Sequence, residues 1–459
     1  MLGLIGTAVC LASDTTVCLA GDAACIQGYT NGTRRVFRGV RYATAERWAP
    51  PRVSEPNWGG AARSAMTFGP ACPQLGPGWA SLRAAGSTTL PAISEDCLFL
   101  NVYAPAATVK GPFPTLVFIH GGSFTWGGSW DAEIASAPQF ARDVPGTSAA
   151  QATLTDRTIY VTLNYRLGAL GYLGGDVLRD RDGTAERGGT GNYGHMDQRA
   201  ALHWVQAHIA AFGGDPQQVT LFGESAGAAG VAAHLTMAAS FGLVSGAAMQ
   251  SGGFANWGSK PMSEAQAVFD AYAAALGCAP AAASEVRACL ARQPLSKLLD
   301  FADPFYGDVS AAAYSRTSSD SSGPFASGLA PGTKGWALPF GNTAARCLWA
   351  PVVDGVELTV PPAAALAAGD IDPSVTRVIL GFNVDEGSLS APSSLSRAEA
   401  ATATARAAAE QSLRMWLGGG EHGIALSSAE ADAVAAAYRV GSRTPQVCFC
   451  YRYILNEFC

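Results

Sequence analysis

Short apolar runs recur along the chain, and most of them lead into glycine. The clearest four are TLVFI, TIYVTL, VTLF and VTRVIL, at residues 115–119, 158–163, 219–222 and 375–380. Runs without a polar face are typical of central strands that are covered on both sides. Earlier in the chain, residues 29–48 predict a hairpin, because Asn31-Gly32 is a tight-turn pair.

A helical pattern lies between the second and third runs. In MDQRAALHWVQAHIAAF, apolar Leu202, Val205, Ile209 and Phe212 recur at spacings of three and four residues, which places them on one face of a helix. Gly213-Gly214 predicts its end. Strands that alternate with helices indicate an α/β fold with a mostly parallel central sheet flanked by helices. Residues 391–440 are rich in alanine and predict further helix, whereas 308–333 predict a surface loop.

Composition narrows the classes of partner. The 459 residues are 48% hydrophobic and 14% charged, so the chain can bury a large core. The net charge is −6 and there is no block of Lys and Arg, so nucleic acid is not an expected partner. No apolar run reaches the roughly 20 residues of a membrane-spanning helix. Residues 1–12 are apolar but lack a basic start, which fits either a leader within residues 1–25 or an incomplete N-terminus.

The cysteines indicate an oxidising compartment. There are eleven of them, and no two Cys-x-x-Cys pairs occur with a histidine nearby, so we expect no zinc site. Many cysteines without metal spacing favour a secreted protein or one in the lumen of the secretory pathway. Asn31-Gly32-Thr33 also forms an N-glycosylation sequon.

A Gly-x-Ser-x-Gly motif follows the third apolar run directly. Gly223-Glu224-Ser225-Ala226-Gly227 lies between VTLF and the helical segment AAGVAAHLTMA, which is the strand–turn–helix context that this motif needs. The turn is so sharp that side chains on either side of the serine would clash, hence the two glycines. The motif predicts Ser225 as a nucleophile for acyl transfer; the alternative is a glycine-rich turn without chemistry.

A second glycine-rich turn, His120-Gly121-Gly122-Ser123-Phe124, follows the TLVFI run. Lipases and esterases use backbone N–H groups of such a turn to bind the substrate oxyanion. We predict the N–H groups of Gly122, Ser123 and Ala226 as the oxyanion hole. His120 is interpreted as a brace for the loop and not as the catalytic base.

Five ordered blocks carry a family resemblance. They are EDCLFLNVYAP (95–105), NYRLGALGYL (164–173), GNYGHMDQRAALHWVQAHIAAFGGDPQQVTLFGESAG (191–227), APVVDGVEL (350–358) and LGFNVDEGS (380–388). Together they resemble the type-B carboxylesterases and cholinesterases from about residue 26 to 390. The resemblance implies an α/β-hydrolase domain over residues 26–459 that hydrolyses a small-molecule carboxylic ester with no metal or organic cofactor. It leaves the oligomeric state open.

The resemblance also implies roles for particular residues. Two disulfides are implied, Cys72–Cys97 and Cys278–Cys289. The acid that orients the catalytic histidine carries over to Glu386, with Asp385 as the alternative. Trp79 lies too soon after Cys72 to match the choline-binding tryptophan of cholinesterases, so we do not identify a cholinesterase. Glu224 either lines the pocket, as in relatives, or is an ordinary turn residue.

The catalytic histidine is where the sequence departs from the family. Relatives carry it well past the acid, but the only histidine after Glu386 is His422, in GGGEHGIAL, which is not the family's histidine motif. The sequence can be truncated, with the C-terminal strand and histidine region missing; His422 can substitute; or the chain can be a catalytically dead binding or adhesion domain. We adopt the first interpretation and expect this polypeptide to be weak or inactive, because a serine without its base is a poor nucleophile. The earlier histidines are predicted to be structural or surface residues and not the base: His195, His203, His208 and His234.

Overall fold

The structure is a computed structural model. It describes residues 15–19, 24–31, 34–53, 62–74, 91–130, 157–179, 188–255, 258–278, 282–299 and 348–382. Several positions singled out in the sequence lie outside these ranges. They are residues 1–12, Gly32, Thr33, Trp79, Asp385, Glu386, His422 and the segments 308–333 and 391–440.

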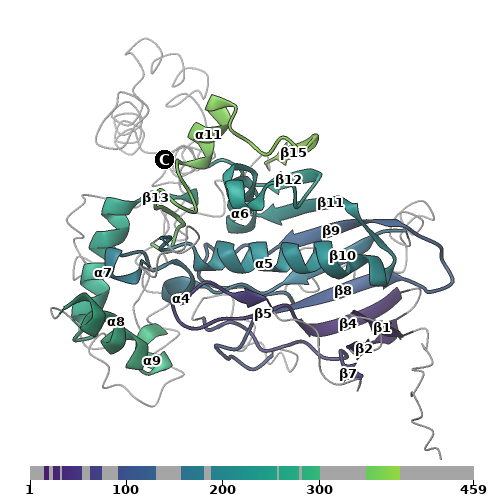
Figure 1. The fold of residues 1–459 in the computed structure, drawn as a ribbon, viewed down its shortest axis with the longest axis horizontal. Helices are drawn as coiled ribbons and strands as arrows, with labels where there is room; N and C mark the ends of the chain where they lie inside the picture. Colours follow the sequence, from purple (N-terminus) through teal and green to yellow (C-terminus); the bar gives the residue numbers. More distant parts are fainter. Residues whose placement is uncertain are drawn as a thin grey trace, which may run out of the picture.

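An eight-stranded mixed sheet forms the centre of the molecule (Figure 1). In spatial order it contains β15 (Arg377–Gly381), β12 (Gly246–Gln250), β11 (Gly214–Glu224), β9 (Phe113–Ile119), β10 (Ile159–Leu163), β8 (Phe99–Pro105), β4 (Arg34–Arg41) and β3 (Tyr29–Asn31). Neighbouring strands from β15 to β10 are parallel, whereas β8, β4 and β3 continue the sheet in antiparallel pairing. The carboxyl ends of the parallel strands therefore meet at one edge of the sheet.

Smaller strand pairs and the helices surround this sheet. The minor strands are β1 (Thr16–Cys18), β2 (Cys25–Gln27), β7 (Arg63–Ser64), β5 (Ala43–Thr44), β6 (Arg52–Val53), β13 (Lys260–Pro261) and β14 (Val352–Val353). The α-helices are α4 (Gly168–Tyr172), α5 (Tyr193–His208), α6 (Ala226–Thr236), α7 (Met262–Ala275), α8 (Ala283–Arg292), α9 (Leu295–Leu299) and α11 (Pro362–Ala368). Short 3₁₀ turns are η2 (Asp176–Leu178), η4 (Ile209–Phe212) and η5 (Ala238–Ser240). In Figure 1, α5 and α6 lie across one face of the sheet, and α7, α8 and α9 group beyond one end of it.

The four apolar runs of the sequence are strands β9, β10, β11 and β15, and the predicted hairpin is the antiparallel pair β3–β4. The α/β class with a sheet flanked by helices is confirmed. One interpretation is wrong: the run at 375–380 is not covered on both sides. Val378, Ile379 and Leu380 are 50%, 71% and 49% exposed, and among the described residues β15 is an edge strand that pairs with β12.

The predicted amphipathic helix is α5, which continues into η4. All four residues of its predicted apolar face are buried: Leu202, Val205, Ile209 and Phe212. The helix ends at Gly213, whose φ of +92° is left-handed, as a glycine stop requires. By contrast, α6 is buried on every side, which explains its almost continuous run of small apolar residues.

Candidate active site

Ser225 stands between a strand and a helix at the carboxyl edge of the sheet. β11 ends at Glu224 and α6 begins at Ala226, so Ser225 is the single residue of the turn. Its φ is +55° and its ψ −123°, a conformation that costs a non-glycine residue about 1–3 kcal/mol. The strand–turn–helix arrangement that the motif predicts is therefore present, with serine at its strained position.

Two hydrogen bonds hold the backbone of this turn. The Ser225 N–H donates to the Gln250 carbonyl at 2.9 Å, and the Ser225 carbonyl accepts from the Ala229 N–H at 3.0 Å. The first bond extends the pairing of β11 with β12, and the second opens α6. Strain at Ser225 is thus supported by regular structure on both sides.

The glycines that flank the serine are required by close packing. A Cβ at Gly227 would lie 2.1 Å from the Ile119 carbonyl oxygen, and one at Gly223 would lie 2.5 Å from the Gly227 carbonyl carbon. Both distances are far below van der Waals contact. The sequence argument, that side chains at these two positions would clash, is confirmed.

The glycine-rich loop after β9 passes beside the serine. A Cβ at Gly121 would lie 3.2 Å from the Ser225 Cβ. Gly122, Ser123 and Phe124 follow with φ of +100°, +52° and +61°, so three successive residues are left-handed and the backbone curls tightly. The loop therefore presents main chain, not side chain, to the nucleophile position.

Ala226 contributes the helical side of the same site. It is the first residue of α6, and the N–H groups in the first turn of a helix have no partner within that helix. The partial positive charge of a helix N-terminus favours an anion there. Glu224 lies nearby as well, since a Cβ at Gly121 would be 2.9 Å from its Oε2, so its exposed carboxylate borders the loop.

His120 is buried beneath the loop. Its Nδ1 lies 2.8 Å from the Gly121 carbonyl, its ring stacks on Tyr165 at 4.3 Å, and the Tyr165 hydroxyl donates to the His120 carbonyl at 2.8 Å. Burial lowers the pKa of His120 to about 4, so the ring is neutral at pH 7 and donates from Nδ1. This geometry braces the loop, in agreement with the role predicted for His120.

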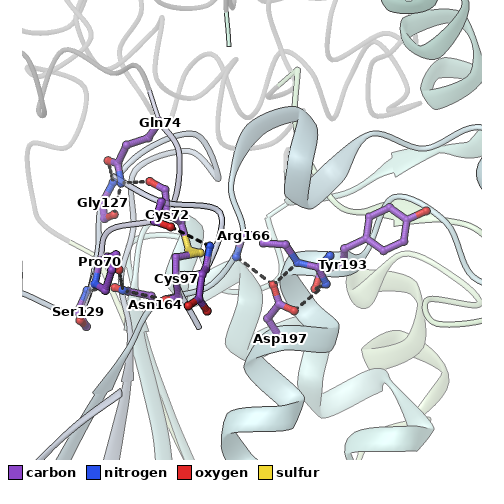
Figure 2. Close-up of a disulfide and its surroundings, with 12 residues drawn as sticks. Pro70, Cys72, Gln74, Cys97, Gly127, Ser129, Asn164, Arg166, Tyr193 and Asp197 are labelled. Carbon is purple, nitrogen blue, oxygen red and sulfur yellow. Dashed lines mark hydrogen bonds and ion pairs between the residues drawn. A yellow bond between two sulfur atoms is a disulfide. The ribbon is translucent and has the colours of Figure 1, made fainter. Parts of the chain in front are cut away.

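Gln74 braces the same loop from the other side, which the sequence did not reveal. Its amide forms a reciprocal pair with Gly127, donating to that carbonyl and accepting from that N–H, both at 2.9 Å. It also donates to the Cys72 carbonyl at 3.0 Å. Figure 2 shows these bonds beside the Cys72–Cys97 disulfide, so the bridge anchors the segment that holds the glycine-rich loop after β9.

Asn164 completes this support (Figure 2). Its Nδ2 donates to the carbonyls of Pro70 and Cys97 at 2.9 and 3.1 Å, and its Oδ1 accepts from the Ser129 N–H at 2.8 Å. The buried side-chain amide of Asn164 therefore joins the disulfide, the end of β10 and the segment that follows the glycine-rich loop after β9.

Both disulfides implied by the resemblance are present, Cys72–Cys97 and Cys278–Cys289. A third, Cys18–Cys25, was missed. It joins directly opposed residues of β1 and β2, strands of three residues each, which are too short to give a pattern in the sequence.

A buried ion pair fixes the turn after β10 to α5. Arg166 donates from Nε and Nη2 to Asp197 at 2.7 and 2.8 Å, and its backbone N–H adds a third bond at 3.0 Å. Figure 2 shows the two side chains facing each other. Asp197 is fully buried, and such a bidentate pair is geometrically specific. It holds α5 in place behind the loops of the site.

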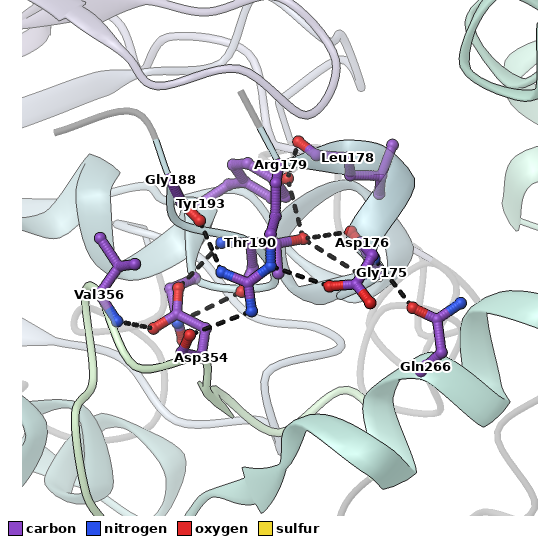
Figure 3. Close-up of polar contacts among 11 residues, drawn as sticks. Gly175, Asp176, Leu178, Arg179, Gly188, Thr190, Tyr193, Gln266, Asp354 and Val356 are labelled. Carbon is purple, nitrogen blue, oxygen red and sulfur yellow. Dashed lines mark hydrogen bonds and ion pairs between the residues drawn. The ribbon is translucent and has the colours of Figure 1, made fainter. Parts of the chain in front are cut away.

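A second network ties the start of α5 to the 350–358 block (Figure 3). The Asp354 carboxylate accepts from the N–H groups of Thr190, Val356 and Leu358 at 2.9, 3.0 and 3.1 Å. Arg179 donates to the carbonyls of Gly188 and Asp354 at 2.7 and 3.0 Å. The aspartate of this block is thus architectural.

None of the five histidines in the described ranges is placed to serve as the base. His195 and His234 are buried, and burial lowers the pKa of His195 to about 3 and that of His234 well below its usual value. His203 and His208 lie in the second half of α5. That half leads to the start of β11, and the 11 residues of β11 that separate this point from Ser225 span about 36 Å at 3.3 Å per strand residue.

Glu386 and Asp385 lie outside the described residues. The strand that precedes them, β15, ends at Gly381, whose carbonyl accepts from the Ser251 N–H at 2.8 Å. This bond joins the end of β15 to the segment after β12, at the edge of the sheet that carries Ser225.

The described ranges contain no group of three or more His, Cys, Asp or Glu side chains that could hold a metal ion. None of their helices has both the length and the apolar character needed to cross a membrane.

Comparison with known proteins relates this site to a family. The model of the carboxylesterase family matches residues 19–438. Pyrethroid hydrolase Ces2e of Rattus norvegicus is 33% identical over 57% of this chain and 43% of its own length. Para-nitrobenzyl esterase of Bacillus subtilis is 36% identical over 50% of this chain and 42% of its own. The cAMP-regulated D2 protein of Dictyostelium discoideum is 31% identical over 75% and 53%.

The chain spans about half or less of the length of these relatives. The family match nevertheless covers most of this sequence. It includes Ser225, the glycine-rich loop at residues 120–124 and the cysteines of both disulfides that the resemblance implied. On that basis the chain belongs to the carboxylesterase family.

Proposed function

We propose that this chain hydrolyses small-molecule carboxylic esters through an acyl intermediate on Ser225, at a weak but measurable rate, because the catalytic base is the part of the triad that the sequence does not identify. The observation that carries the proposal is the close approach of two segments: Ser225 has the strained φ of +55°, and a Cβ built at Gly121 would lie only 3.2 Å from the Ser225 Cβ. A nucleophile beside preorganised N–H groups is the arrangement that acyl transfer needs.

The reaction follows from these positions. The Ser225 hydroxyl attacks the ester carbonyl, and the N–H groups of Gly122, Ser123 and Ala226 stabilise the oxyanion of the tetrahedral intermediate. The alcohol leaves, and water then releases the acyl group from the serine. Each N–H group is held by a braced backbone, so it needs little reorganisation when the charge develops.

A base and an acid complete the proposal. Glu386 is the acid, because it occupies the family's position after β15, and its role is to orient an imidazole and stabilise its protonated form. The base is assigned to a residue beyond the described ranges, since the buried or distant histidines within them do not suit the role. The names of relatives, among them a para-nitrobenzyl esterase and an acylcarnitine hydrolase, support ester substrates.

The compartment is part of the proposal. Three disulfides among the described residues favour an oxidising environment, and secretion or residence in the secretory lumen would supply it. Asn31, the first residue of the sequon, is exposed at the end of β3, where a glycan would meet no packing obstacle.

Hydrolysis of p-nitrophenyl esters tests the function. Ser225→Ala is expected to remove the enzymatic rate, and the loss should be smaller than the about 10⁴–10⁶-fold of a complete triad, because the wild-type rate is itself weak. The matched control is Ser64→Ala, which alters an exposed serine on β7 and is expected to change the rate less than twofold. Equal rates in wild type and Ser225→Ala, or no hydrolysis by the folded wild type, would instead support a non-catalytic binding domain.

A further inference from the structure

The segment after β12 lies directly against the backbone of the nucleophile. A Cβ built at Gly252 would be 2.4 Å from the Ser225 carbonyl oxygen and 3.0 Å from its carbonyl carbon. Ordinary contacts of a Cβ begin near 3.4 Å. Position 252 therefore has no room for a side chain, and the atoms that fill this space belong to the peptide between Ser225 and Ala226.

The carbonyl and the N–H of this peptide have different roles. Its carbonyl accepts from the Ala229 N–H at 3.0 Å and so begins α6. Because a trans peptide is planar, with C=O and N–H on opposite sides, the Ala226 N–H points away from that carbonyl. Gly252 thus touches one end of a rigid unit whose other end is the proposed oxyanion donor.

The segment after β12 is held by hydrogen bonds to its neighbours, which limit its movement away from Ser225. Gln250 pairs with Glu224 in β11 and with Gly381 in β15. The next residue, Ser251, donates its N–H to the Gly381 carbonyl at 2.8 Å. Pressure from a side chain at 252 would therefore fall on the Ser225 peptide. On the opposite side, the Gly121 backbone limits how far Ser225 can move.

We propose that Gly252 is a positioning residue for the oxyanion hole: by lacking a side chain, it sets the orientation of the Ser225–Ala226 peptide and hence of the Ala226 N–H. The expected effect of Gly252 on turnover rests on the proposed function. Its effect on the orientation of the Ala226 N–H holds for the folded chain without substrate.

Gly253 supplies a matched control. A Cβ there would be equally crowded, at 2.7 Å from the Leu380 Cδ1 and from the Met249 Cβ and Sδ. Those neighbours are side chains and not the backbone of Ser225. Gly252→Ala and Gly253→Ala thus add the same methyl group one residue apart, and differ in whether it meets the nucleophile's peptide.

The catalytic test compares kcat, KM and inhibition by a trifluoromethyl ketone, which forms a tetrahedral oxyanion on the serine. Gly252→Ala is expected to lower kcat/KM about 10- to 100-fold, less than the roughly 10²–10³-fold loss of a whole donor. The loss should fall on kcat, and inhibitor affinity should weaken by a similar factor. Gly253→Ala should change each quantity less than threefold.

A structural measurement keeps the inference separate from the proposed function. In amide NMR spectra of the protein without substrate, the Ala226 N–H resonance should shift in Gly252→Ala and stay in place in Gly253→Ala. If the wild type hydrolyses no ester, the proposed function fails, and this spectrum still decides the inference. An Ala226 resonance unmoved in Gly252→Ala would overturn it, as would equal kcat losses in both variants.

The double variant Gly252→Ala/Leu380→Ala covers the case in which Gly252→Ala does not fold. Leu380 is half exposed and packs against the adjacent Gly253, so its truncation gives the segment room to move away from Ser225. We expect the double variant to fold and to keep more kcat than Gly252→Ala, or a measurable kcat if that variant is unfolded. A folded double variant with a lower kcat than Leu380→Ala and an Ala226 resonance in the same place as in Leu380→Ala would contradict the positioning role, because the loss would then not arise from the Ser225–Ala226 peptide.

Discussion

At Ser225 the main chain adopts a conformation that a serine would avoid in isolation. Its φ of +55° is maintained because the N–H and the carbonyl of the same residue are both bonded to regular structure, in β12 and α6. The strain is therefore supported by the fold. It keeps Ser225 at the carboxyl edge of the sheet, the position that the proposed function requires.

His120 provides a test at the level of one residue. His120→Asn is expected to lower the ester-hydrolysis rate by no more than about tenfold, because an Asn amide can still donate to the Gly121 carbonyl. The measurement is kcat/KM against pH. A loss of about 10⁴-fold, the scale of removing a catalytic base, would contradict the interpretation of His120 as a neutral brace.

Between helices, the main polar feature is a buried pair of histidines. The rings of His195 on α5 and His234 on α6 stack at 5.6 Å. The Tyr172 hydroxyl lies 3.1 Å from His195 Nδ1, and His234 bonds to Ser240 and Gln198 at 2.9 and 3.0 Å. Both helices flank the site, since α6 starts at the nucleophile and α5 packs against it.

This pair should make the fold sensitive to acid. Burial lowers the pKa of His195 to about 3, so below about pH 6.5 the unfolded chain binds a proton that the folded chain does not. The stabilisation that comes from neutral His195 is therefore fully present above about pH 6.5. Below that pH the free energy of unfolding decreases as the pH falls. The contribution of His195 is up to about 1.4 kcal/mol per pH unit.

Urea unfolding of wild type and His195→Leu at pH 7.5, 6 and 5 measures this contribution. The other titrating groups are common to both proteins, so the difference between the two pH slopes isolates the histidine. We expect the variant to lose less stability between pH 6 and 5 than the wild type. Identical slopes would mean that His195 is protonated in the folded protein.

Elements with a strong local pattern could be predicted from sequence, and elements defined by pairing could not. The apolar runs identify β9, β10, β11 and β15, and the periodicity around Leu202 identifies α5. β12, with the sequence GAAMQ, has little pattern and is a strand because β11 and β15 pair with it. The exposure of β15 depends on which strands neighbour it, which no local pattern records.

The candidate site also combines features that the sequence predicts with features that only the fold reveals. The glycine motifs reveal the backbone turns at Ser225 and Gly121, because close packing at Gly121, Gly223 and Gly227 leaves no room for side chains. The braces are invisible in sequence: Gln74 reaches Gly127 across 53 residues, and Asn164 reaches Pro70 across 94. An amide that bonds distant backbone has no local signature, so its role appears only when the chain is folded.

On the scale of the molecule, the two family disulfides differ in their distance from the chemistry. Cys72–Cys97 closes a separation of 25 residues beside the Gln74 brace, whereas Cys278–Cys289 closes 11 residues from the end of α7 to α8. On the chain-entropy model each contributes roughly 2–4 kcal/mol. Similar contributions to stability should therefore accompany different effects on activity.

Paired Cys→Ala variants of each bridge test this difference. Both are expected to lower the free energy of unfolding by roughly 2–4 kcal/mol, measured by urea unfolding. Loss of Cys72–Cys97 should also lower kcat per folded molecule, while loss of Cys278–Cys289 should leave it near wild type. The reverse order of kcat values would show that the oxyanion loop does not depend on the first bridge.

The central claim is that Ser225 is the reactive nucleophile. The most direct measurement is covalent labelling of the folded protein with a fluorophosphonate, followed by mass spectrometry of its peptides. We predict a single adduct on Ser225, absent from Ser225→Ala and unchanged in Ser64→Ala. An adduct on another residue, or a folded wild type that remains unlabelled under prolonged exposure, would contradict the account.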